Sequence, residues 1–318
     1  MVFCQIIISP NKMILLTGGT GFLGSNLLAR LVGKHSVIVL KRSFSDTGRI
    51  KHLLKKVRTY DIDRVPVKEV FDANKIDLVI HCATNYGRSS VPFTEITGAN
   101  LILPLHLIQE SREHGVAAFI NTDTILDKGV SAYSLSKSQF VDWMKQFAES
   151  LICIDMALEH FYGPFDDRSK FVAKIILDLL NRVERIELTP GRQKRDFIYI
   201  EDIVSAFERV IDFTRSAAKS FYRFEVGTAQ TIEIRDFVQM AKTLAGNTTT
   251  HLDFGALPYR GNEVMESRVD ISALLALGWK PQTPLQKGLK ETIQLEEKAL
   301  NEISHNRRLR VPGNKPLS

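Results

Sequence analysis

Long hydrophobic runs are missing from this sequence of 318 residues, and cysteine is scarce. No apolar run approaches the roughly 20 residues that a membrane-spanning helix needs. The first residues also lack the basic start and the cleavage site of a signal peptide. Cys4, Cys82 and Cys153 have no metal-like spacing, and strand-like surroundings favour small buried thiols over ligands. We therefore expect a cytoplasmic protein with reduced cysteines, no bound metal and no membrane partner.

A strong excess of one charge is missing too. The 42 basic and 36 acidic residues leave a formal net charge of +6, and the surplus is scattered apart from "HNRRLR" near the C-terminus. This distribution gives no sign of a nucleic-acid partner. With 44% hydrophobic residues, the chain can bury a core of one large domain, or of a large and a small one.

Strand-like and helix-like segments alternate along the first half of the chain. The order at residues 13–17, 24–31, 36–40, a basic helix, 78–83, 100–115, 117–121 and a helix containing Tyr133 predicts crossover helices on a parallel sheet. After about Tyr162 the elements become shorter and mixed. We predict an α/β fold with a Rossmann-type doubly wound parallel sheet and a smaller mixed C-terminal substrate region, with the ligand outside the carboxyl ends of the strands.

The predicted domains follow from this change of rhythm. A nucleotide-binding domain would cover residues 13–165, with residues 195–226 returning to it, and residues 166–194 and 227–302 would form the substrate-binding region. Residues 1–12 precede the first strand, and residues 303–318 carry the basic run and "VPGNKPLS". We expect both ends to be disordered extensions, and residues 1–12 to be unnecessary for activity.

Three glycines follow the first predicted strand in "TGGTGFLG". Gly18, Gly21 and Gly24 stand where the strand gives way to a helix, and glycine there lets the backbone turn and approach a pyrophosphate. The second strand ends in Lys41, Arg42 and Ser43, where NAD enzymes usually place an acidic residue. Basic residues at a strand end can simply be solvated, but they also suit a 2′-phosphate, so we predict NADP(H) rather than NAD(H).

Tyr133 and Lys137 lie four residues apart, which places them on one face of a helix. Taken alone, the pair could be a surface tyrosine with a solvated lysine. Because the chain also has the glycine motif, the pair favours a catalytic role. A tyrosine normally titrates near pH ~10, so proton transfer at neutral pH needs a nearby cation.

These motifs together resemble the extended short-chain dehydrogenase/reductase family of sugar-nucleotide enzymes. The likeness covers nearly the whole chain and includes "DLVIHCAT", "LEHFYGP", "KRDFIYIEDIV", "YRGNEV" and "LGWKPQTPLQKGLKETI". The resemblance is stronger to those family members that reduce the 4-keto group of CDP-linked 3,6-dideoxyhexoses for surface polysaccharides. It rests on "HCATNYGR", "FINTDT" and "FGALPYRGNEVM".

The resemblance implies roles for individual residues. Tyr133 would be the general acid/base, Lys137 would bind the nicotinamide ribose and lower the pKa of Tyr133, and Thr122 would hydrogen-bond the reacting oxygen. The residues it assigns to the cofactor are Gly18, Thr20, Gly21, Phe22, Leu23, Gly24, Lys41, Arg42, Asp61, Ile62, Cys82, Ala83, Thr84, Asn100, Tyr133, Lys137 and His160.

The resemblance also implies a substrate site. Arg195 and Arg260 match arginines that hold phosphate, a task suited to a planar charged fork. Glu263 would lie near the nucleotide ribose. The remaining substrate candidates are Asn85, Tyr86, Asp123, Thr124, Lys170 and Phe171, with Arg88 beside them.

Some positions depart from the family pattern. Dehydratases of the family carry Asp-Glu after the catalytic threonine, whereas this chain has Asp123 and Thr124, which leaves no base beside the ketone. Asp123 would hydrogen-bond either the sugar or the backbone. The segment from Thr122 to Tyr133 is short, Ala157 replaces a common arginine, and His160 would be either a contact residue or a structural one.

We therefore expect an NADPH-dependent 4-ketoreductase acting on a nucleotide-linked deoxysugar, with a 4-epimerase that retains its cofactor as the alternative. A non-catalytic NADP-binding regulator fits less well, because the Tyr, Lys and Thr set is intact. A homodimer is expected, since "NLILPLHLIQES" and "SQFVDWMKQFAES" carry apolar residues on more than one face.

Overall fold

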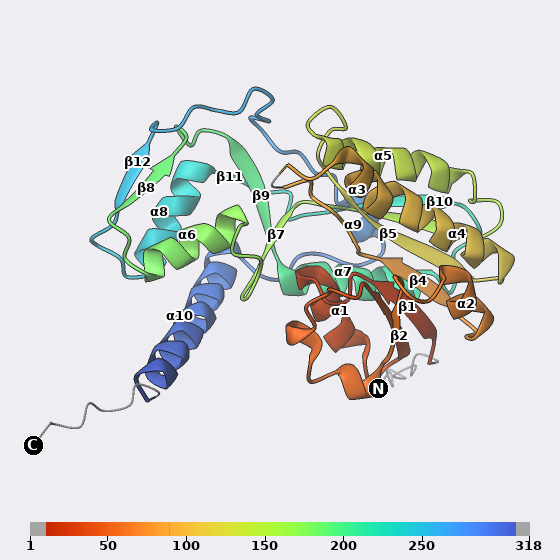
Figure 1. Cartoon of the computed structure of the whole chain (residues 1–318). Coiled ribbons are helices and arrows are strands. Elements are labelled where there is room, and N and C mark those ends of the chain that lie inside the picture. The colour runs from red at the N-terminus through yellow and green to blue at the C-terminus, as the bar shows by residue number, and fades with distance from the viewer. Residues whose placement is uncertain (1–10, 89, 310–318) are drawn as a thin grey trace, which may run out of the picture. The chain divides into compact units, whose positions relative to one another are not determined.

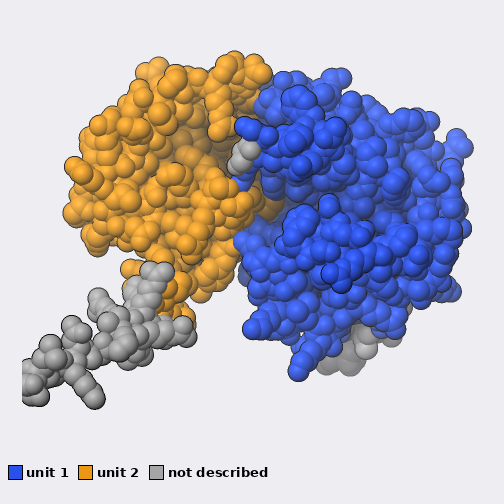
Figure 2. Space-filling model, viewed as in Figure 1, with its two compact units in different colours: residues 1–159, 200–229, 268–281 blue, residues 160–199, 230–267, 282–318 orange. Residues whose placement is uncertain are grey.

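The computed structural model describes residues 11–88 and 90–309 (Figure 1). The chain divides into two compact units. Unit 1 comprises residues 1–159, 200–229 and 268–281, and unit 2 comprises residues 160–199, 230–267 and 282–318 (Figure 2). Cys4 and most of the two predicted extensions, residues 1–10 and 310–318, lie outside the described residues. No helix in the described part of the chain is long and apolar enough to cross a membrane.

Unit 1 is built on a seven-stranded sheet in which all neighbouring strands are parallel. Its order is β10-β6-β5-β4-β1-β2-β3. The strands are β1 (Met13–Thr17), β2 (Ser36–Lys41), β3 (Arg58–Asp61), β4 (Leu78–His81), β5 (Ala118–Thr124), β6 (Ile152–Leu158) and β10 (Phe221–Val226). Central strands such as β1 and β4 are almost continuously apolar and buried, as expected when helices cover both faces of a parallel sheet. The predicted Rossmann-type fold is confirmed.

Helices cover this sheet. They are α1 (Phe22–Leu31), α2 (Val67–Asp72), α3 (Phe93–Thr97), α4 (Leu103–Glu113), α5 (Ala132–Lys145), α7 (Ile200–Phe213) and α9 (Ser272–Ala276). A core that includes Phe71 of α2, Leu107 of α4, Phe119 of β5 and Phe140 of α5 fixes α5 on the sheet. Strand-like and helix-like segments alternate regularly in the sequence. Most of the observed elements therefore lie where the sequence predicted them.

The basic helix expected after β2 is absent from the structure. Two short 3₁₀ helices replace it, at Gly48–Ile50 and Leu54–Lys56. Only Ile50 and Leu53 of this region are buried, which is too little apolar surface to hold a longer amphipathic helix on the sheet.

Unit 2 contains smaller sheets. β7 (His160–Tyr162), β9 (Lys194–Tyr199) and β11 (Thr231–Glu233) form a three-stranded sheet in the order β11-β9-β7, and β8 (Arg185–Leu188) pairs with β12 (His251–Phe254). The helices of this unit are α6 (Phe171–Leu180), α8 (Ile234–Leu244) and α10 (Leu285–Leu309).

The boundaries of the units differ from the predicted domains by a few residues. Residues 160–165 and 195–199 fall in unit 2, because β7 and β9 pair with each other there. Residues 268–281 fall in unit 1, where the Nε1–H of Trp279 donates to the Ser205 hydroxyl at 2.8 Å. At the two ends, Lys12 Nζ donates to Thr214, and α10 continues to Leu309 rather than ending near residue 303.

Candidate active site

The glycine loop lies against the segment that follows β4. Gly18 has φ +66°, and a Cβ atom there would lie 2.6 Å from Ala83 N and from Cys82 C. The Gly21 amide donates to Gly18 O at 2.9 Å and closes the turn. Since β2 and β4 flank β1 on opposite sides, the loop stands at the point where the strand order reverses, which is the usual position of a nucleotide site.

The start of α1 leaves room for a phosphate group. Gly21 stands at the N-cap and has no side chain that could bond the first amides of the helix. Phe22 and Leu23 are only 7% and 9% exposed, so their predicted role falls to their main-chain amides. A Cβ at Gly24 would lie 2.1 Å from Gly18 O. These residues fit a dinucleotide, because only glycine allows so close a turn at the start of a helix, where unpaired amides bind a pyrophosphate.

The buried His81 bonds to Thr17, which in turn holds the segment that lies against the glycine loop. Thr17 Oγ1 accepts hydrogen bonds from the amides of Cys82 (3.2 Å) and Ala83 (3.1 Å), so its proton is left for His81 Nδ1, 2.9 Å away. The imidazole proton then belongs on Nε2. Burial and the charge of Lys137 hold the pKa of His81 well below its usual value, so the ring is neutral.

Basic and acidic side chains meet where β2 and β3 end. Arg42 Nε forms an ion pair with Asp63 and lies over the Phe44 ring, 5.0 Å from its centroid. The Ser43 hydroxyl donates to Asp61 at 2.6 Å and lowers the pKa of that carboxyl. The sequence showed no acidic residue at the end of β2 itself, but Asp61, which ends β3, and Asp63, which follows it, lie beside it. Asp61 and the half-buried Ile62, which we predict to contact the cofactor, thus lie next to the basic segment.

Tyr133 is placed by the first turn of α5. Ser131 and Ser134 form a capping box, with Ser134 N donating to Ser131 Oγ at 3.2 Å and Ser131 N donating to Ser134 Oγ at 3.1 Å. The Tyr133 ring packs against Tyr86 with centroids 5.1 Å apart. Burial raises the pKa of the phenol, while hydrogen bonds with Thr124 and Thr84 oppose that rise.

Lys137 lies one turn further along α5 and is only 2% exposed. Its ammonium donates to Thr122 O at 2.6 Å. The Thr122 hydroxyl in turn donates to His81 O at 2.8 Å. Burial raises the pKa of Tyr133 in the protein by itself, so the lowering that we expect from Lys137 stays a prediction.

Asn100 links the segment after β4 to α5. It lies in a π-helix, Gly98–Ile102, within the helical run that joins α3 to α4. Its Oδ1 accepts from Thr84 Oγ1 and Asn85 N, and its Nδ2 donates to Asn85 O and Ser136 Oγ, at 2.8–3.1 Å. The amide group already has two donors and two acceptor positions in use. A contact with the cofactor would require one of these bonds to be exchanged.

Asp123 has a partner that neither sequence-based alternative included. Arg223 of β10 donates from Nη1 to Asp123 (3.2 Å) and to Asp155 (2.6 Å). Asp123 is 8% exposed and Asp155 is fully buried. The carboxylate of Asp123 is therefore held by a cation within unit 1 rather than by the backbone.

Unit 2 brings its predicted phosphate-binding residues together. Arg195 Nη2 forms an ion pair with Glu263, and the Glu263 amide donates to Arg260 O at 3.1 Å. Lys170 forms an ion pair with Asp166 at 3.0 Å, and the partly exposed Phe171 ring lies 6.0 Å from Phe237 between centroids.

His160 begins β7 and is exposed. Its ring meets Phe197 edge-on, with centroids 6.0 Å apart. This contact lies inside unit 2, as expected for the structural alternative.

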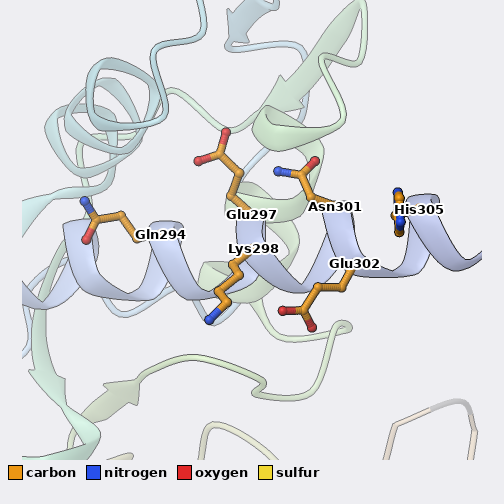
Figure 3. A pocket seen from close by; sticks show the side chains of 6 residues that line it. All are labelled: Gln294, Glu297, Lys298, Asn301, Glu302 and His305. Atoms are coloured by element: carbon orange, nitrogen blue, oxygen red, sulfur yellow. The ribbon is translucent and has the colours of Figure 1, made fainter.

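A separate hollow of about 600 Å³ lies along α10. Figure 3 shows its lining side chains, Gln294, Glu297, Lys298, Asn301, Glu302 and His305, which all come from this helix. None of the residues predicted for the site is among them.

Sequence reasoning missed several residues that support the site. Thr17 and His81 end β1 and β4, and their polarity after apolar strands was an available signal. Asp155 and Arg223 lie in β6 and β10, where only the pairing of distant strands brings them to Asp123.

Comparisons with known proteins show related sequences over most of the chain. The pattern that describes the NAD dependent epimerase/dehydratase family matches residues 14–227. CDP-abequose synthase of Salmonella muenchen is 33% identical over 297 residues, which cover 90% of this chain and 99% of that protein. A mouse dTDP-D-glucose 4,6-dehydratase is 26% identical, with 89% and 88% covered.

Solved structures share the fold. UDP-glucose 4-epimerase of Thermotoga maritima, determined with UDP-glucose, superposes with a TM-score of 0.81 at 24% identity, and 91% of this chain and 99% of that one are covered. MoeE5 in complex with UDP-glucuronic acid and NAD gives a TM-score of 0.76 at 22% identity, with 90% and 99% covered.

Proposed function

The chain belongs to the NAD dependent epimerase/dehydratase family and is a nucleotide-sugar enzyme of the short-chain dehydrogenase/reductase type, and we propose that it uses NADPH to reduce a 4-keto group. The substrate is a CDP-linked 3,6-dideoxyhexose or 6-deoxyhexose made for a surface polysaccharide. The observation that carries the proposal is the pair of Tyr133 and the buried Lys137, which lie one turn apart on α5, with no glutamate at position 124.

The bound cofactor would supply a hydride to the carbonyl carbon. Tyr133 donates its proton to the carbonyl oxygen, and its raised pKa keeps the phenol protonated before the reaction. Hydrogen bonding with the Thr124 hydroxyl lowers the pKa of the phenol and so favours the phenolate that remains. Thr122 orients the sugar oxygen after its hydroxyl turns from His81 O, and Lys137 holds the nicotinamide ribose.

Thr124 argues against dehydration. A dehydratase must remove the proton adjacent to the ketone, and a threonine hydroxyl is too weak a base for that step at neutral pH. Asp123 does not replace the missing glutamate, because Arg223 holds its carboxylate. The residues that remain near the phenol can move a proton to and from one oxygen, which suffices for ketone reduction.

The alternative is a nucleotide-sugar 4-epimerase, which would use the same residues and keep its cofactor bound. The fold shared with UDP-glucose 4-epimerase favours it. Incubation of the protein with NADPH and CDP-linked 4-keto-3,6-dideoxy- and 4-keto-6-deoxyhexoses separates the two. A reductase forms the 4-hydroxy sugar and one NADP⁺ per product, whereas an epimerase converts a 4-hydroxy sugar to its epimer without consuming NADPH.

We expect NADPH to bind more tightly than NADH. Lys41 and Arg42 lie at the end of β2. The Arg42 guanidinium can exchange its ion pair with the exposed Asp63 for one with a 2′-phosphate, which carries more negative charge. Lys41→Ala/Arg42→Ala should weaken NADPH binding, by about 1–3 kcal/mol for lost charge-assisted hydrogen bonds, and leave NADH binding unchanged. Titration of cofactor fluorescence measures both affinities. Equal binding of the two cofactors by the unchanged protein would contradict the preference and indicate that Asp61 or Asp63 binds ribose hydroxyls.

We expect a homodimer that pairs through α4 and α5. Ile102, Leu135 and Trp143 are 46%, 44% and 54% exposed on this part of unit 1, which is costly for apolar side chains left in water. Trp143→Glu should convert the dimer to a monomer, as measured by light scattering at micromolar concentration. Leu257→Glu, a change at an exposed apolar residue of unit 2, is the matched control and should keep the dimer mass. A monomeric unchanged protein would contradict the expectation.

A further inference from the structure

Three strands of unit 1 align polar side chains on one face of the sheet. In the register of the sheet, Asp155 of β6 pairs with Asn121 of β5 and with Arg223 of β10. Registered neighbours in a sheet point to the same face. Accordingly, Asn121 Nδ2 donates to Asp155 Oδ1 at 2.9 Å, and Arg223 Nη1 donates to Asp155 Oδ2 at 2.6 Å. Asp155 has no exposed surface, so these bonds replace its water.

This face is the one that α5 covers. Asp123 follows Asn121 by two residues in β5 and therefore points the same way. A cavity of about 420 Å³ is lined by Asp123 and Arg223 from the sheet and by Ser134 and Ser138 from α5, among others. The carboxylate cluster, which we define as Asp123, Asp155 and Arg223, thus lies beneath the helix that carries the predicted acid and its lysine.

Lys137 enters this region from α5. Its ammonium donates to the main-chain oxygen of Thr122, the residue between Asn121 and Asp123. Among the residues that the structure describes, no carboxylate lies within the 4.0 Å limit of an ion pair with Lys137. A buried ammonium with one carbonyl acceptor is costly and tends to lose its proton unless opposite charges lie nearby.

The carboxylate cluster supplies negative charge that favours the protonated form of Lys137. Burial and the neighbouring Asp123 raise the pKa of Asp155 to about 7. Above that pH the cluster carries two negative charges, of which Arg223 balances one and the other is left to balance the ammonium. Burial lowers the pKa of Lys137, whereas Asp123 and Asp155 raise it. The remaining titratable groups around the ammonium are the neutral His81 and the thiol of Cys82, and Glu225 lies beyond Arg223.

We propose that Asp155 is a positioning residue that, with Asp123, keeps the buried Lys137 ammonium charged, and that Arg223 and Asn121 hold Asp155 in place for this purpose. The proposal rests on the proposed function only for the use that the reaction makes of Lys137. The charge of the ammonium itself can be measured without substrate.

The direction in which the pKa of Lys137 should change follows from the signs of the charges. Removal of the negative charge of Asp155 takes away an interaction that favours the protonated amine, so the pKa of Lys137 falls further below its usual value. Lys137 then loses its proton at a lower pH. Cofactor affinity, which needs the ammonium at the ribose, should weaken at alkaline pH and stay nearly unchanged at pH 6.

The test is an NMR titration of protein that carries ¹³Cε-labelled lysine, with the Lys137 signal assigned by its loss in Lys137→Met. In Asp155→Asn the Lys137 titration should move down by about one pH unit, a usual shift for one nearby charge. Asp77→Asn is the matched control. That carboxylate accepts the Met13 amide at 2.7 Å at the other end of the sheet, so the Lys137 titration should not move.

Asp123→Asn provides a second variant, because its carboxylate borders the cavity and its loss should disturb folding less. It should lower the Lys137 titration in the same direction. The proposal is overturned if Lys137 titrates at the same pH in both variants and in the unchanged protein, or if NADPH binding to them weakens equally at pH 6 and pH 9. A shifted titration in a protein that reduces no keto sugar would instead contradict the proposed function.

Discussion

Tyr133→Phe is expected to lower kcat for keto-sugar reduction by about 10²–10⁴-fold, the usual contribution of a general acid. The Tyr133 phenol is the predicted proton donor, and its raised pKa keeps it protonated before the reaction. The substitution removes one hydroxyl and keeps the ring that packs against Tyr86 at 5.1 Å. NADPH affinity, measured by fluorescence titration, should therefore remain nearly unchanged.

Tyr222→Phe is the matched control for this variant. It removes a phenol of β10 that donates to Ala218 O at 3.1 Å, yet kcat should stay close to that of the unchanged protein, because Tyr222 is not among the predicted site residues. Thr122→Val should keep a weak activity, since Thr122 orients the oxygen without supplying the proton. A Tyr133→Phe protein with a near-normal rate would contradict the mechanism and direct attention to Asp123 as the donor.

Gly24→Ala is expected to weaken NADPH binding by about ten- to one-hundredfold, because a forced contact in a packed site costs about 1–3 kcal/mol. The new Cβ would lie 2.1 Å from Gly18 O and 2.6 Å from Gly18 C. Backbone atoms cannot turn aside as a flexible side chain can. The turn between β1 and α1 would have to open, and the amides that face the pyrophosphate would move.

Gly98→Ala controls for the added methyl group. A Cβ at Gly98 meets no atom within 4 Å, and its φ of −56° suits alanine. This variant should bind NADPH normally in the same titration. Unchanged affinity in Gly24→Ala would show that the cofactor does not depend on this turn.

The sequence predicted best what depends on residues close together in the chain. The glycine turn and the Tyr133/Lys137 pair each lie within one strand-turn-helix unit or one helix, where spacing alone fixes the geometry. Apolar strands with intervening helices gave the sheet for the same reason.

Contacts between segments that are far apart in the chain could not be predicted from spacing. Arg223 reaches Asp123 across 100 positions of sequence, and Arg42 meets Asp63 from a neighbouring strand. Such pairs depend on strand order and register, which no local pattern specifies. The rise in the pKa of Tyr133 could not be predicted for a related reason, because spacing shows the neighbouring lysine but not the burial that raises the pKa.

The most direct test of the proposed reduction uses NADPH that carries deuterium at the transferable position of nicotinamide C4. The protein is incubated with this cofactor and a CDP-linked 4-keto-3,6-dideoxyhexose, and the product is analysed by mass spectrometry and NMR. We predict one deuterium at C4 of the sugar for each NADP⁺ formed. A sugar product without deuterium, formed while NADPH remains unconsumed, would contradict the account and favour an epimerase.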